Sequence, residues 1–86
     1  MSDDDRVAVD TAGLWPEEVT DDAGLVINWF ADEGAAVTEG QRLCEVQVEK
    51  VDVDVFSPVD GVLDEVVYGE DEEFQRGDTL AYVAPD

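Results

Sequence analysis

Apolar and polar residues alternate along much of this chain, and this pattern predicts strands that each bury one face. The clearest run covers residues 42–48 and resumes over residues 51–55, with cysteine or valine at every second position from Cys44 onward. Only Glu49 and Lys50 separate the two runs, which is the spacing of a two-residue hairpin loop. The pattern therefore predicts a β-hairpin with Lys50 at its tip.

Other strands are predicted on both sides of this hairpin. Strands are expected over residues 7–10 and 24–30, with a short segment over 37–40 and a second set of strands after the Ser57–Gly61 break. The segment between the first two strands contains glycine, proline and acidic pairs, so we expect a loop there. Leu14 and Trp15 of this loop should cover an edge of the core.

The second set of strands repeats the first with a shift of 37 residues. The matched pairs are Gly24 with Gly61, Val26 with Leu63, Glu33 with Glu70, Val37 with Phe74, Gly40 with Gly77, Leu43 with Leu80, and Val46 with Val83. Two copies are too few for a stacked solenoid. They favour an all-β fold, a flattened barrel or sandwich of two four-stranded antiparallel sheets with internal pseudo-two-fold symmetry. The hairpin tip should then project from one end.

Composition narrows the picture. The chain has 86 residues, enough for one domain, with 24 acidic and four basic residues and a formal net charge of -20. Such a charge makes nucleic acid and anionic membranes unsuitable partners. At about 1 M salt the screening length falls to roughly 3 Å, which removes most of the repulsion between the carboxylates. The composition therefore favours a protein from the cytoplasm of a halophile. An acidic protein of an ordinary organism is the alternative.

Cys44 is the sole cysteine, which excludes an internal disulfide, and its place within a strand predicts a buried thiol. The N-terminus lacks the basic and apolar features of a signal peptide, and no apolar run approaches the length of a membrane-spanning helix. We expect residues 1–6 to be a disordered acidic segment, residues 7–86 to form the domain, and the protein to be cytoplasmic. The start at Met1 and the lack of a trailing linker favour a complete small protein.

Lys50 is the candidate functional residue. A lysine in a β-turn is ordinarily only a solvated charge. Here it is the single lysine of a chain that has three arginines, and valines on both arms should hold its turn in place. The pattern therefore favours an amine presented to an enzyme.

The residues around Lys50 resemble a known family. The segment Glu45-Val46-Gln47-Val48-Glu49-Lys50-Val51 and the Val55–Val62 segment are similar to the attachment region of biotinyl/lipoyl domains. The lipoyl domains of 2-oxoacid dehydrogenase acyltransferases are the most similar. Gly24, Trp29, Glu33-Gly34, Val37, residues 40–43 and residues 77–81 fall at the family's spacing, so the resemblance covers about residues 23–84. It implies the family's single hybrid motif fold, with lipoate on Lys50 and Glu45, Glu49 and Val51 as recognition flanks.

The resemblance also implies a function. A lipoyl carrier is a swinging arm that moves acyl groups between active sites. Its partners would be a lipoate-attachment enzyme, a 2-oxoacid dehydrogenase, the acyltransferase core and dihydrolipoamide dehydrogenase. Biotin carriers typically have methionine on each side of the lysine, whereas Lys50 lies between Glu49 and Val51. A biotin carboxyl carrier, a carrier of the glycine-cleavage type and an unmodified interaction module remain alternatives.

A catalytic role has little support in the sequence. The chain has no histidine, which excludes a Ser-His or Cys-His pair and a histidine-ligated metal. The carboxylates do not follow a calcium-loop spacing, and Asp52 and Asp54 should form a solvated strand face. We therefore expect a non-catalytic cofactor carrier without a metal site.

Overall fold

The computed structural model describes residues 5–86, and all regular elements among them are strands. They are β1 (Val7–Asp10), β2 (Ala23–Trp29), β3 (Ala36–Val37), β4 (Arg42–Val48), β5 (Val51–Phe56), β6 (Gly61–Val66), β7 (Glu73–Gln75) and β8 (Thr79–Pro85). The predicted strands over residues 7–10 and 42–48 are confirmed to the residue. Within the described part of the chain there is no helix long and apolar enough to cross a membrane.

Two predicted elements have different bounds. The strand predicted over residues 24–30 begins and ends one residue earlier, as β2. Of the segment predicted over 37–40 only Val37 is in a strand, because β3 begins at Ala36 and a turn follows it, in which the Gln41 N–H donates to the Thr38 carbonyl oxygen and Gly40 adopts a φ of 83°. Most of the predicted disordered segment, residues 1–4, lies outside the described residues.

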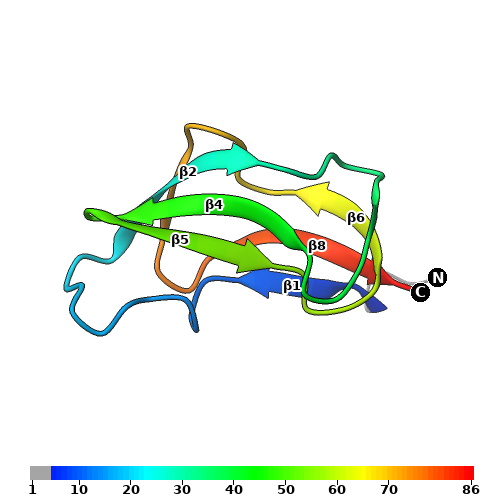
Figure 1. Cartoon of the computed structure of the whole chain (residues 1–86), viewed down its shortest axis with the longest axis horizontal. Helices are drawn as coiled ribbons and strands as arrows, with labels where there is room; N and C mark the ends of the chain where they lie inside the picture. The colour runs from blue at the N-terminus through cyan, green and yellow to red at the C-terminus, as the bar shows by residue number, and fades with distance from the viewer. Residues whose placement is uncertain (1–4) are drawn as a thin grey trace.

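The strands form two four-stranded antiparallel sheets, which confirms the predicted fold class. We call the sheet of order β5-β4-β2-β7 the hairpin sheet, and the sheet of order β1-β8-β6-β3 the terminal sheet. Figure 1 shows that the tip of the β4–β5 hairpin lies toward one end of the molecule, and that the start of β1 and the C-terminus lie at the other. These two ends are separated along the longest dimension of the molecule, which is 39 Å.

The two sheets are not the two sequence repeats. In the hairpin sheet Gly24 pairs with Phe74, and in the terminal sheet Val37 pairs with Gly61. The short strand β3 of the first half thus belongs to the terminal sheet, and the short strand β7 of the second half belongs to the hairpin sheet. Because the 37-residue shift carries one pairing onto the other, the exchange obeys the predicted pseudo-two-fold symmetry.

Strand β1 is the counterpart of β5, although the sequence repeat does not include either strand. Val53 pairs with Val46, and Val7 pairs with Val83, the repeat mate of Val46. The symmetry therefore superposes the β4–β5 hairpin on the pair β8 and β1. The position equivalent to the hairpin tip is the place where the two chain ends emerge.

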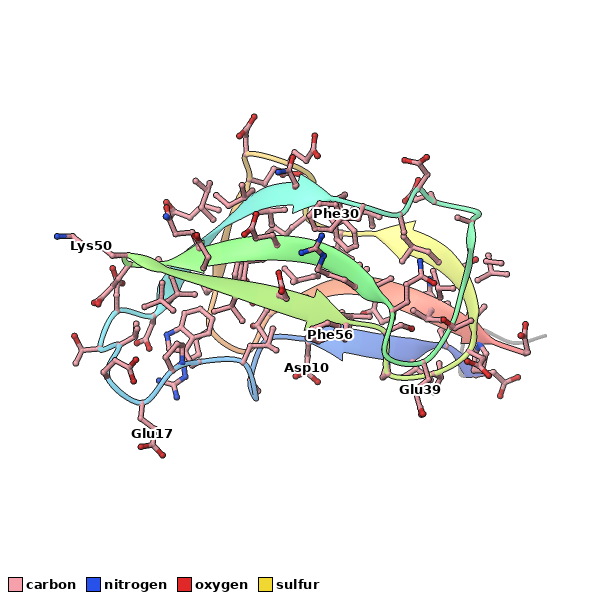
Figure 2. All side chains as sticks on the ribbon, viewed as in Figure 1. Asp10, Glu17, Phe30, Glu39, Lys50 and Phe56 are labelled. Atoms are coloured by element: carbon pink, nitrogen blue, oxygen red, sulfur yellow. The ribbon has the colours of Figure 1, made fainter. Side chains whose placement is uncertain are left out.

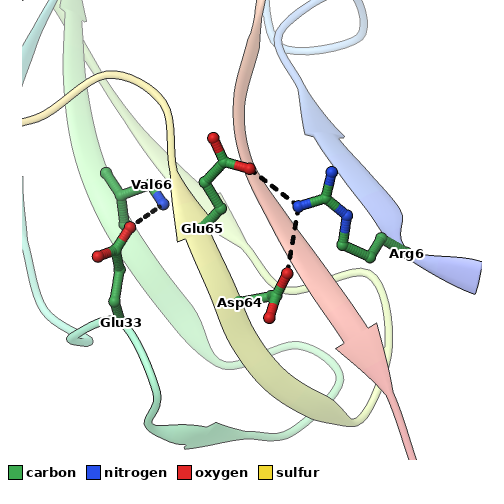
Figure 3. Close-up of polar contacts among 5 residues, drawn as sticks. All are labelled: Arg6, Glu33, Asp64, Glu65 and Val66. Carbon is green, nitrogen blue, oxygen red and sulfur yellow. Dashed lines mark hydrogen bonds and ion pairs between the residues drawn. The ribbon is translucent and has the colours of Figure 1, made fainter. Parts of the chain in front are cut away.

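Two glutamates connect the halves reciprocally. Glu33 Oε2 accepts a hydrogen bond from the Val66 backbone N–H at 2.7 Å, as Figure 3 shows. Glu70, the repeat mate of Glu33, accepts one from the Trp29 N–H at 3.0 Å. Both bonds satisfy backbone donors where the strands β6 and β2 end.

Arg6 lies against the terminal sheet, near the N-terminal end of the described chain. Its Nη1 is 2.9 Å from a Glu65 carboxylate oxygen and 3.1 Å from one of Asp64 (Figure 3). Its guanidinium also lies 4.3 Å from the centre of the Tyr82 ring. The start of β1 is therefore attached to β6 and β8 through one side chain.

A single core fills the space between the sheets. Trp15 is buried and meets the Phe74 ring edge-on at 5.9 Å, which confirms that the loop before β2 covers an edge of the core. Its indole N–H donates to the Asp21 carbonyl oxygen at 2.6 Å, so the loop is closed on itself. Cys44 is buried as predicted, and burial, aided by the Asp54 charge, raises the pKa of its thiol to about 12. Its thiol is therefore protonated and unreactive at ordinary pH.

Candidate cofactor-attachment site

The hairpin tip consists of two exposed residues, Glu49 and Lys50, as the sequence predicts. Val48 pairs directly with Val51, so the loop contains no further residue. Glu49 adopts a φ of 57°, whereas the φ of Lys50 is not positive. A type I′ turn needs positive φ at both positions, so the turn is of another kind. The turn depends on one glutamate in a conformation that asparagine, aspartate and glycine adopt more easily.

The arms of the hairpin hold this turn in a fixed position. Val46, Val48 and Val55 are each about 1% exposed, and Val51 and Val53 pack partly buried against the same core. The register is fixed because a slip by one residue would turn these valines to solvent. On the opposite face Asp52 and Asp54 are exposed, which confirms the predicted solvated face.

Lys50 differs from the three arginines in its surroundings. Each arginine forms an ion pair with a carboxylate and lies over an aromatic ring: Arg6 on Tyr82, Arg42 on Phe30, and Arg76 on Trp15. Within residues 5–86, no hydrogen bond or ion pair involves the Lys50 amine. Figure 2 shows Lys50 pointing outward, beyond the end of the hairpin. The only lysine is thus exposed at the end of the hairpin.

The predicted recognition flanks lie at different distances from this amine. Glu49 and Val51 are its immediate neighbours. Glu45 pairs with Asp54, four rungs of the ladder away from the turn. At about 3.3 Å per residue, its Cα lies on the order of 16 Å from that of Lys50. The structure therefore brings two of the three flanks together with the lysine and leaves Glu45 apart.

The titratable side chains around the turn are carboxylates. The chain contains no histidine. In the part of the chain that the structure describes, acidic and cysteine side chains do not form a cluster of three that could hold a metal ion. An accessible amine on a rigid hairpin is suited to be modified by another protein.

Comparison with protein families gives a match over residues 16–83 to the biotin/lipoyl family, described as "Biotin-requiring enzyme". The chain belongs to the biotin/lipoyl domain family. Domains of this family are carriers of a covalently attached cofactor. The match includes both arms of the hairpin and the Lys50 turn.

Two curated relatives match most of this chain. The chain is 36% identical over 64 residues to the dihydrolipoyllysine-residue acetyltransferase component of the pyruvate dehydrogenase complex of Staphylococcus aureus. It is 31% identical over 67 residues to the succinyltransferase component of the 2-oxoglutarate dehydrogenase complex of Staphylococcus saprophyticus. These matches cover 73% and 78% of the chain, but only 15% of each relative. The chain thus corresponds to one small part of these proteins.

Solved structures agree on the fold. The lipoyl domain of the 2-oxoglutarate dehydrogenase complex from Azotobacter vinelandii matches with a TM-score of 0.68 and 28% identity, covering 88% of this chain and 95% of that domain. A single-chain, multi-domain long-chain acyl-CoA carboxylase matches the whole chain and 8% of its own length, with a TM-score of 0.79 and 19% identity. At that identity the second match supports the fold alone.

The structure also places residues near the tip that sequence reasoning did not identify. Leu25 on β2 pairs with Gln47 on β4 and with Glu73 on β7, so three strands present these side chains in one row. Glu73 is far from Lys50 in sequence, and no local pattern connects the two. Only the pairing of β2 with β7 brings Glu73 to this end of the molecule.

Proposed function

We propose that Lys50 bears lipoate and that the chain acts as a lipoyl carrier for a 2-oxoacid dehydrogenase-type complex. The observation that supports this most directly is the exposed, unpaired Lys50 amine at the tip of a rigid hairpin. The proposal takes lipoate rather than biotin because the curated relatives are dihydrolipoyllysine-residue acyltransferases and because Glu49 and Val51 flank the lysine.

In this function the chain supplies position and reach. The buried valines of β4 and β5 hold the turn, and the turn holds the lysine clear of the sheets. Lipoate in amide linkage to the amine supplies a dithiolane that accepts an acyl group. Tethering raises the effective concentration of the attached group at each partner's active site. Those partners are a lipoate-attachment enzyme, the 2-oxoacid dehydrogenase, the acyltransferase core and dihydrolipoamide dehydrogenase, and the chain itself is non-catalytic.

Intact mass after co-expression tests the proposal. With a lipoate ligase and lipoate present, we expect the mass of the chain to increase by one lipoyl group. The Lys50→Arg variant should stay unmodified and keep its melting temperature, because the side chain is exposed. If the mass increases only with a biotin ligase, the lipoyl proposal is wrong and the chain is a biotin carrier. Modification of the Lys50→Arg variant would show that the site is wrong.

We further propose that the protein works in the cytoplasm of a halophile. The support is the formal charge of -20, distributed over strands and turns alike. Screening of the repulsion between carboxylates should raise the melting temperature on going from 0.1 M to 2 M KCl. A melting temperature that is unchanged or lower in 2 M KCl would remove the basis for this proposal.

A further inference from the structure

A cross-strand row of four side chains lies on the outer face of the hairpin sheet, close to the Lys50 turn. Asp52 pairs with Gln47, Gln47 with Leu25, and Leu25 with Glu73, so the row crosses all four strands. We call these four residues the tip row. The Gln47–Asp52 rung is separated from the turn by the Val48–Val51 rung alone, a distance of about 7 Å along the hairpin.

The tip row combines an apolar centre with acidic ends. Leu25 is 36% exposed and is one of four large apolar side chains that are exposed in the described chain, after Phe56, Phe30 and Val67. Glu73 and Asp52 are exposed on either side of it, and Gln47 donates from Nε2 to Asp52 Oδ1 at 3.3 Å. This hydrogen bond orients one carboxylate, whereas the other is free to meet an incoming donor.

A shallow hollow of about 220 Å³ continues this surface to the turn. Leu25 and Gln47 line it together with three carboxylates, those of Asp21, Glu49 and Glu73. Because Glu49 is the residue next to Lys50, the hollow lies beside the place where a protein would engage the amine. Such a protein would meet one leucine surrounded by negative charge.

The pseudo-two-fold symmetry provides an internal comparison. The symmetry equivalents of Glu73, Leu25 and Gln47 are Ala36, Val62 and Ala84, which form the corresponding row of the terminal sheet. These three residues have the same strand pairing and no polar side chain, and Arg6, the residue before Val7 in the register of β1 with β8, stands where the tip row has Asp52. The backbone arrangement therefore does not require the glutamate and the glutamine, and the difference is confined to the end that presents Lys50.

From this difference we propose that the tip row is the docking surface for the enzyme that modifies Lys50. The surface of that enzyme would seat Leu25 in an apolar depression flanked by lysine or arginine side chains that contact Glu73 and Asp52. Charge complementarity speeds encounter, and the apolar contact provides specificity at high salt, where screening weakens the steering. This inference rests on the proposed lipoyl function, since it concerns the attachment enzyme.

Steady-state lipoylation of the full 86-residue chain tests it, with kcat/KM as the readout. Leu25→Ala should lower kcat/KM about tenfold and Glu73→Gln about threefold, the sizes expected of a central and a peripheral interface residue. Val67→Ala removes a comparably exposed apolar side chain elsewhere, and Glu39→Gln removes one charge at the opposite end (Figure 2). Both controls should stay within about twofold of wild type. Thermal melts establish that all four variants are folded.

The outcomes separate the two proposals. If wild type is lipoylated but the tip-row variants behave like their controls, the docking surface is wrong and the lipoyl function stands. If all four variants are slowed equally, the docking surface is also wrong, because the loss of any charge or any apolar side chain would then have the same effect wherever it lies. If only a biotin ligase modifies wild type, the lipoyl function fails. The same four variants assayed with that ligase then decide the docking surface. Absence of any modification overturns both.

Discussion

The two ends of this molecule have nearly the same backbone and different chemistry. At one end β4 and β5 meet in the Lys50 turn, and at the other their counterparts β8 and β1 leave the fold as chain termini. The buried polar residues Ser57 and Thr11 occupy equivalent positions, and each backbone N–H donates to a carbonyl oxygen of the turn beside it, that of Gln41 or Asp78. The framework is thus duplicated in detail.

The difference lies in what each end presents to solvent. The hairpin end has the accessible lysine, the acidic hollow and the tip row. The terminal end has Arg6 attached to Asp64, Glu65 and Tyr82, together with a row of small apolar residues. This contrast separates a backbone framework that the two halves share from surface positions where the halves have diverged.

Inside the core, the two halves differ most at one pair of repeat mates, Val37 in the first half and Phe74 in the second. Phe74 contacts the rings of Trp15 and Tyr68, so Phe74→Ala should cost about 3–5 kcal/mol of unfolding free energy. Val37→Ala removes less buried surface and should cost about 2 kcal/mol. Urea denaturation measures both values. Equal losses would mean that the aromatic cluster adds nothing to the duplicated core.

Gly24 and Gly61 are equivalent positions at which neighbouring atoms leave no room for a side chain, and the neighbours differ between the two. A Cβ on Gly24 would meet the Phe74 ring, and one on Gly61 would meet the backbone of Ala84 and Pro85. Each alanine variant should lose about 1–3 kcal/mol, with Gly61→Ala the worse because backbone of a paired strand cannot move aside. Combining Gly24→Ala with Phe74→Leu should recover part of the loss, as a double-mutant cycle would measure. No recovery would contradict the assignment of the clash to the ring.

The reciprocal glutamates should contribute equally. Glu33→Ala and Glu70→Ala each leave one backbone N–H without its carboxylate partner, at a cost of about 1 kcal/mol. Measuring unfolding in 1 M KCl suppresses the change in general repulsion that accompanies loss of a charge. If only one variant is destabilised, the two contacts are alike in geometry but not in energy.

The smallest effect concerns the turn itself. Glu49 has a φ of 57°, so Glu49→Gly should raise the unfolding free energy by about 0.5 kcal/mol, the strain relieved minus the entropy cost of glycine. Asp71 has a φ of 69° and is the repeat mate of Gly34. Asp71→Gly should gain less, because aspartate tolerates this conformation better. Thermal melts of both variants measure the difference, and a loss of stability in Glu49→Gly would contradict the strain.

Local patterns in the sequence were enough to predict several features. The alternation of valines and acids predicted β4 and β5 and left two residues for the turn, so the exposed position of Lys50 followed directly. The shift of 37 residues predicted the symmetry. The strands depend on the periodicity of apolar side chains, which can be recognised from residues close together in the sequence.

The tertiary structure alone decided which strands pair across the halves. Nothing local in residues 73–75 indicates that β7 joins β2, because register between distant strands is set by packing of the whole core. That pairing forms the tip row and places Glu73 beside Leu25. The sequence by itself thus determined which residue is presented, and the long-range pairing determined the surface that surrounds it.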